Sequence, residues 1–153
     1  MVIGNINNAD NRNELITRLD KLTPDKLPLW GKMSSVQMLS HLNDAFRCAL
    51  GMKSLQGKGF PSWLQYPARL IFVHWIKWPK GLPAPPEFQA DKGGSSPRDF
   101  ETERAFLKTM LDVFCERPED KFVPHPVFGK MNKKDYGKML YKHSDHHLRQ
   151  FGV

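Results

Sequence analysis

The interpretation of this chain starts from its C-terminal stretch, Tyr141-Lys142-His143-Ser144-Asp145-His146-His147. Residues four apart on an α-helix lie on one face, about 5–6 Å apart, and this is the spacing of His143 and His147. At about 100° per residue, both histidines share a stripe with apolar side chains, whereas the lysines lie on the opposite side. The stretch therefore predicts an amphipathic helix that presents two imidazoles on its inward face.

His146 lies about 100° from its neighbour His147 on the same helix, so it points in another direction and is the weaker candidate as a partner of His143. A third suitable histidine, His41, lies far upstream, at the edge of the apolar stripe of another predicted helix. Three neutral imidazoles with no fourth protein ligand form an open site of the kind that catalytic zinc uses. The alternative is that these are buried histidines hydrogen-bonded to carbonyls or hydroxyls, since buried polar groups need partners.

Helical periodicity dominates the rest of the chain, and alternating polar and apolar residues are scarce. Ser34 or Ser35 is a suitable N-cap for the helix that carries His41, and Asn132 for the last helix. The motif Ser96-Pro97-Arg98-Asp99 is typical of a helix start. We expect an all-α fold in a single domain, residues 1–153, with helices over residues 11–21, 34–50, 63–78, 96–117 and 132–152. Residues 79–96, rich in proline and glycine, would form a long crossover loop.

The composition agrees with one ordinary globular domain: 153 residues, of which 40% are hydrophobic. We find no export signal and no stretch long and apolar enough for a membrane span, and only two cysteines occur, so we expect a cytoplasmic protein. The net charge of +7 raises nucleic acid as a partner, but no nucleic-acid motif accompanies it, and we do not expect that function.

With His41 and the last helix in place, the chain resembles the DinB-like (YfiT-like) superfamily of four-helix metalloenzymes. The resembling segments run from Trp30 through Ser34 and Gln37 to Leu42, and from Lys142 to Gln150. A further segment, His125-Pro126-Val127-Phe128-Gly129, resembles a branch of the superfamily without an assigned function. The resemblance implies a four-helix bundle, to which this chain would add an N-terminal helix.

The resemblance also implies a divalent metal ion, nickel or zinc, held by one histidine of an early helix and the pair on the last. Carried over, these are His41, His143 and His147, the residues that helical phase selects. Superfamily members include thiol-dependent transferases and isomerases, and homodimers are common among them. We therefore expect a small-molecule substrate, with a cellular thiol as one candidate, a transferase or hydrolase reaction, and a homodimer formed through the aromatic helix at residues 63–78.

A non-catalytic metal-binding, small-molecule-binding or stress-response module is the alternative, and it would use the same three histidines without turnover. By helical phase, Asp44, Gln37 and Tyr136 are the nearest candidates for supporting or proton-transfer roles beside the histidines. The sequence does not assign a reaction to any of them.

Overall fold

The computed structural model describes residues 4–54, 59–81 and 93–153. Within these ranges the protein has five α-helices and no β-strand, which confirms the all-α prediction. The helices are α1 (Ala9–Asp20), α2 (Ser35–Ala49), α3 (Ser62–Arg69), α4 (Phe100–Glu116) and α5 (Lys133–Gln150), with a π-helical segment η1 (Leu70–Trp75) after α3 and a short 3₁₀ turn η3 (Glu119–Lys121) after α4. None of the helices in these ranges has the length and apolar character that crossing a bilayer requires.

Side-chain caps set the starts of the long helices. Ser34 and Gln37 form a reciprocal capping box at the start of α2, and Asn132 caps α5 by accepting a hydrogen bond from the backbone N–H of Asp135, as predicted. The fourth helix begins later than the motif at Ser96 suggested, because Asp99 is the N-cap and accepts from the N–H of Thr102. An aspartate with extended backbone satisfies an unpaired N–H of the first turn.

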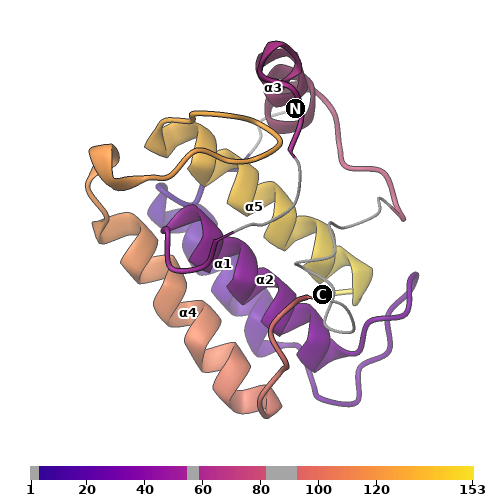
Figure 1. The fold of residues 1–153 in the computed structure, drawn as a ribbon. Helices are drawn as coiled ribbons and strands as arrows, with labels where there is room; N and C mark the ends of the chain where they lie inside the picture. The colour runs from indigo at the N-terminus through magenta and orange to yellow at the C-terminus, as the bar shows by residue number, and fades with distance from the viewer. Residues whose placement is uncertain (1–3, 55–58, 82–92) are drawn as a thin grey trace.

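Helices α1, α2, α4 and α5 supply most of one hydrophobic core, to which Ala68 and Val73 also belong. Helix α2 packs against α4 and α5, and α1 also packs against these two helices (Figure 1). Leu15 and Leu19 of α1 are buried in this core together with residues such as Phe46, Phe114 and Leu140. The N-terminal helix is therefore part of the core. This arrangement places α2 beside α5, the two helices that carry the histidines.

Helix α3 contributes a single residue, Ala68, to this core. Its main contacts are with η1, and η1 packs against α5. The sequence predicted one helix over residues 63–78, but the α-helix ends at Arg69, and the π-turns of η1 end at Trp75. Pro67 lies inside α3 and removes a backbone donor, which favours such a break. Ile76 is extended, so Trp78 follows the helix and does not belong to it.

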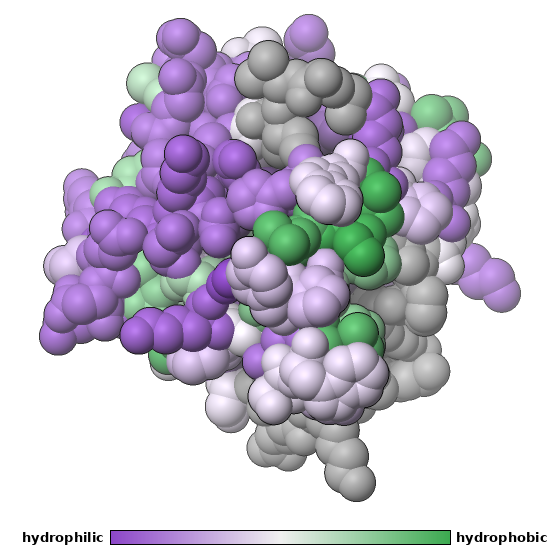
Figure 2. Space-filling view, turned by 90° about the horizontal axis from the view of Figure 1, so that it is seen from above, coloured by the Kyte–Doolittle hydropathy of each residue, from purple (hydrophilic) through white to green (hydrophobic). Residues whose placement is uncertain are grey.

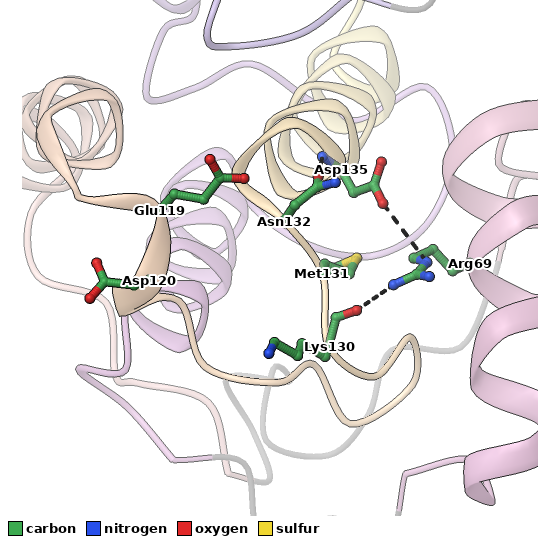
Figure 3. A pocket seen from close by; sticks show the side chains of 7 residues that line it. All are labelled: Arg69, Glu119, Asp120, Lys130, Met131, Asn132 and Asp135. Atoms are coloured by element: carbon green, nitrogen blue, oxygen red, sulfur yellow. Dashed lines mark hydrogen bonds and ion pairs between the residues drawn. The ribbon is translucent and has the colours of Figure 1, made fainter.

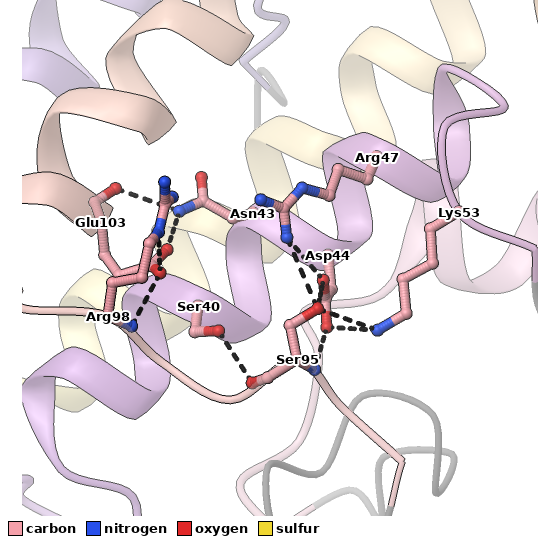
Figure 4. A network of polar contacts seen from close by, with 8 residues as sticks. All are labelled: Ser40, Asn43, Asp44, Arg47, Lys53, Ser95, Arg98 and Glu103. Carbon is pink, nitrogen blue, oxygen red and sulfur yellow. Dashed lines mark hydrogen bonds and ion pairs between the residues drawn. The ribbon is translucent and has the colours of Figure 1, made fainter.

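The predicted crossover loop falls largely on residues 82–92, outside the described residues. Its last part is anchored on α2 by the buried carboxylate of Asp44 (Figure 4). This carboxylate accepts hydrogen bonds from the backbone N–H and the hydroxyl of Ser95, and it forms an ion pair with Lys53. Burial alone would raise the pKa of Asp44, but the hydrogen bonds from Lys53 and Ser95 outweigh it and hold this pKa below its ordinary value. Asp44 thus fastens the loop end and does not support the histidines.

Candidate metal centre

Three imidazoles from two helices converge at one point between α2 and α5. His41 Nε2 lies 2.8 Å from His143 Nε2, and His147 Nε2 lies 3.2 Å from the same atom. One nitrogen from each of the three rings lies within 4.8 Å of the others. His143 and His147 are one turn apart on α5 and so share a face, as the sequence predicted, while the packing of α2 on α5 brings His41 to them.

These nitrogen separations fit a divalent cation held by imidazoles. Zinc–nitrogen bonds are about 2.0–2.1 Å long, so two ligand nitrogens at angles between about 90° and 110° around one ion lie about 2.9–3.4 Å apart. The observed 2.8 and 3.2 Å lie at or close to this range. Two of the three separations therefore match those around a bound ion, and the nitrogens of His41 and His147 lie within 4.8 Å of each other. Three protein ligands leave the remaining coordination positions of an ion to water or substrate.

Two of the imidazoles, those of His143 and His147, are also in the protonation state that a metal ligand needs. Burial lowers the pKa of His147 to about 3, and proximity to His41 contributes to the shift. Burial, with the neighbouring His41 and His147, likewise holds the pKa of His143 well below its ordinary value. A ligand imidazole must be neutral, because its lone pair binds the metal. At neutral pH no proton has to be displaced from these two rings.

His146, which helical phase set aside, lies next to the cluster but outside it. Its ring packs edge-on against Trp30, with ring centroids 5.9 Å apart, and lies 6.3 Å from Trp78. Trp78 also packs against His143, at 5.2 Å between centroids, and its indole N–H donates to the carbonyl of Phe72. Two tryptophan rings therefore cover the side of the cluster on which His146 lies.

The residues that helical phase suggested for supporting or proton-transfer roles, Asp44, Gln37 and Tyr136, have partners elsewhere in the structure. The side chain of Gln37 is engaged in the capping box of α2. Tyr136 is completely buried, and its hydroxyl donates to the carbonyl of Val123 at 2.5 Å. Burial raises the pKa of Tyr136 above its ordinary value, which opposes a role in proton transfer. In the described part of the chain, no carboxylate belongs to the histidine cluster.

Two residues that contact the histidine cluster, Gln150 and Trp78, were not predicted from the sequence to do so. Gln150 is buried and its Oε1 lies 2.8 Å from Nδ1 of His147. Helical phase places it on the histidine face, one turn beyond His147, and this was the available signal. Trp78 gave no such signal, because the sequence placed it on a helix that ends before it.

Another cavity, of about 470 Å³, lies at the opposite end of α5 (Figure 3). Its lining includes Arg69, which pairs with Asp135 at 3.8 Å and donates to the carbonyl of Lys130. Asp135 precedes His143 by eight residues, about 12 Å along a helix. This cavity is therefore separate from the histidine cluster, and two of its charged groups, Arg69 and Asp135, pair with each other.

Comparison with known families assigns the chain without assigning an activity. The family model described as a protein of unknown function (DUF1569) matches residues 7–152, and the chain belongs to this family. The match includes both helices that carry the three histidines. No curated protein and no solved structure matches the chain significantly.

Proposed function

We propose that this DUF1569 protein is a metal-dependent enzyme with a DinB-like four-helix architecture, in which His41, His143 and His147 hold a nickel or zinc ion. The observation that carries the proposal is the convergence of three Nε2 atoms at spacings of 2.8 and 3.2 Å. An all-imidazole site suits either metal. The cluster is partly closed by the rings of Trp30 and Trp78 around His146, which limits the access of bulk water.

The proposed reaction class is thiol-dependent transfer or hydrolysis of a small molecule. A bound divalent ion supplies Lewis acidity and lowers the pKa of a water or thiol that binds to it. The protein contributes three imidazole ligands on two packed helices, and the ring of Trp78 packs against one of them, His143. A cellular thiol is a suitable substrate for such a site, because its thiolate sulfur is a good ligand for zinc.

A non-catalytic metal-binding module is the second candidate, and one observation favours it. No carboxylate joins the cluster among the described residues, and Asp44, Gln37 and Tyr136 are engaged elsewhere. An enzyme of this kind would then depend on the metal-bound water or the substrate for its proton transfers. Turnover of a small thiol with an electrophilic acceptor by the nickel- or zinc-loaded protein separates the two candidates.

The metal site is tested by elemental analysis of untagged protein after loading with nickel or zinc and exhaustive dialysis. We expect about one equivalent in the wild type and a loss of at least ~100-fold in affinity in His143→Ala, since His143 Nε2 is the atom that both other nitrogens approach. His146→Ala is the matched control, an adjacent buried imidazole outside the cluster, and should retain the metal. Failure of the wild type to bind either ion, or loss of the metal in the control alone, contradicts the proposal.

We also propose a homodimer that forms through α3 and η1. Several of their exposed residues are large and apolar: Trp63 is 75% exposed and Trp75 is 72% exposed, and Tyr66 and Ile71, which lie between them in the sequence, are exposed as well. Figure 2 views this end of the molecule and shows hydrophobic residues near its centre, with many hydrophilic side chains to their left. Monomers rarely leave a contiguous surface of this kind in water. Sedimentation equilibrium at micromolar concentration should give a dimer mass, and a monomer mass would contradict this part of the proposal.

A further inference from the structure

The carboxamide of Gln150 connects His147 to a loop that is distant in sequence. Its Oε1 lies 2.8 Å from His147 Nδ1, and its Nε2 donates to the backbone carbonyl of Trp30 at 2.7 Å. The main-chain carbonyl of the same residue accepts from the N–H of Leu29, also at 2.7 Å. Gln150 is 4% exposed, so these contacts are made away from water. Both ends of its amide are therefore held by specific partners.

The orientation of this amide follows from its partner on the loop. A backbone carbonyl only accepts hydrogen bonds, so the group that faces the Trp30 oxygen must be the NH₂ of Gln150. Turning the amide over would bring two oxygens to 2.7 Å in a buried place, where an unsatisfied acceptor is costly. The oxygen of Gln150 consequently faces His147.

The tautomer of His147 then follows. A neutral imidazole carries one ring hydrogen, and an amide oxygen at Nδ1 requires that hydrogen to be on Nδ1. The lone pair is left on Nε2, the atom that points into the histidine cluster. We propose that Gln150 is a positioning residue that holds His147 as the Nδ1–H tautomer, so that Nε2 is ready to bind a cation. The effect of Gln150 on metal affinity rests on the proposed metal function, whereas the tautomer of His147 does not.

Gly31 makes this arrangement possible. Its φ is +81°, and a Cβ built at this position would lie 2.6 Å from Gln150 Nε2. A side chain at position 31 would therefore clash with the amide of Gln150. It would also have to adopt a backbone conformation that is unfavourable for residues other than glycine. The loop at residues 29–31 can lie directly on Gln150 because one of its residues has no Cβ.

The tautomer is tested first in the metal-free wild-type protein. Ring-nitrogen chemical shifts of protein labelled with ¹⁵N-histidine report which nitrogen of His147 carries hydrogen. We expect hydrogen on Nδ1 and a lone pair on Nε2. The opposite tautomer, or rapid exchange between the two, overturns the inference. This measurement needs no metal, so it stands even if the proposed metal function fails.

The consequence for binding is tested with Gln150→Met, which keeps the size of the side chain and removes the amide. Loss of such an outer partner typically lowers metal affinity about 10–100-fold, and we expect that loss for nickel and zinc, together with a mixture of His147 tautomers in the metal-free variant. Gln65→Met is the matched control. The Gln65 amide also donates to backbone carbonyls, those of Phe60 and Pro126, but it has no contact with His41, His143 or His147 among the described hydrogen bonds. Equal affinities in the two variants overturn the positioning role.

A second pair of variants covers the case in which Gln150→Met does not fold. Gly31→Ala should displace the amide and weaken metal binding in the same direction. Gly81→Ala is its control: φ is +75° there, and no described atom lies within 4 Å of the added Cβ. The two alanines share the backbone strain and differ in the contact with Gln150. Unchanged His147 tautomer and affinity in Gly31→Ala count against the inference.

Discussion

The C-terminal half of α5 and the α3–η1 segment are both rich in rings, yet they are built in opposite ways. On α5, the imidazoles of His143 and His147 face a neighbouring helix and have partners at hydrogen-bonding distance. On α3 and η1, Trp63 and Trp75 are mostly exposed. The difference lies in the elements around them: α5 is packed against α1, α2 and η1, whereas α3 packs mainly on η1. Rings of similar number are therefore buried where helices surround them and exposed where they do not.

Lys142 joins the two regions. The sequence placed it on the solvent side of the last helix, but it is only 9% exposed. Its ammonium donates to the carbonyls of Phe72 and Ile76, at 2.6 and 2.5 Å, near the end of η1. The last carbonyls of a helix lack partners within the helix. One residue before a proposed metal ligand therefore holds the neighbouring segment in place.

The comparison predicts that a metal ion will stabilise the two regions unequally. At a free nickel or zinc concentration of about 100 times Kd, the free energy of unfolding should rise by about 2.7 kcal/mol. Hydrogen exchange should slow in α2 and α5, which supply the ligands, with little change in α3. His143→Ala should show neither effect. Equal protection of α3 would mean that the segment is coupled to the centre more tightly than its contacts indicate.

Replacing Lys142 tests the connection itself. Lys142→Met removes the ammonium from the carbonyls of Phe72 and Ile76, and this should cost about 1–3 kcal/mol of unfolding free energy. Amide exchange in η1 should increase more than in α5. The control is Lys134→Met, the same substitution at an exposed position of the same helix, which should change stability by less than about 0.5 kcal/mol. Equal stability of the two variants in chemical denaturation would show that the carbonyl contacts contribute little.

The exposed rings of α3 and η1 should matter for association more than for folding. Trp63→Ala combined with Trp75→Ala removes the two most exposed rings of the segment and should weaken the proposed dimer at least ~10-fold in sedimentation experiments. The stability of the monomer should change by no more than about 0.5 kcal/mol, as for other surface substitutions. Leu27→Ala is a control, because Leu27 is 80% exposed and lies outside α3. A large loss of monomer stability would show that the rings pack within one chain.

A smaller, pH-dependent effect is expected where α3 begins. The ring of His125 accepts at Nδ1 from the backbone N–H groups of Val127 and Phe128. The next carbonyl, that of Pro126, accepts from the N–H of Phe60. Burial lowers the pKa of His125 to about 4, so the unfolded chain binds more protons than the folded one below a pH of about 6.5. The protein should therefore lose stability as the pH falls from about 6.5 to 4.

His125→Asn checks this origin, because an asparagine oxygen can accept from the N–H two residues later and does not titrate. Denaturation midpoints between pH 7 and 4 should fall less steeply in the variant, and the difference should be localised by hydrogen exchange to the start of α3. The wild type and the variant would show parallel profiles if other groups dominated the acid sensitivity.

Much of the local structure was predictable because its causes lie within a few residues. The caps of α2 and α5 form between residues three apart, as at Ser34 and Gln37. The aromatic segment was harder, since its apolar pattern suggests a helix up to Trp78, and the break after Pro67 depends on how η1 packs on α5. Likewise, nothing near Asp44 in sequence indicated that its partner is Ser95, across the predicted crossover.

The sequence by itself determined the all-α class, the shared face of His143 and His147, and the different direction of His146, because helical phase follows from backbone geometry alone. Only the tertiary structure decided that His41 meets this pair, that Lys142 is buried beneath η1, and that Gln150 is oriented by the carbonyl of Trp30. These contacts join residues that are 66 to 120 positions apart in the chain. Their formation depends on which surfaces helices bury against one another, and a local pattern states which face is apolar but not which partner covers it.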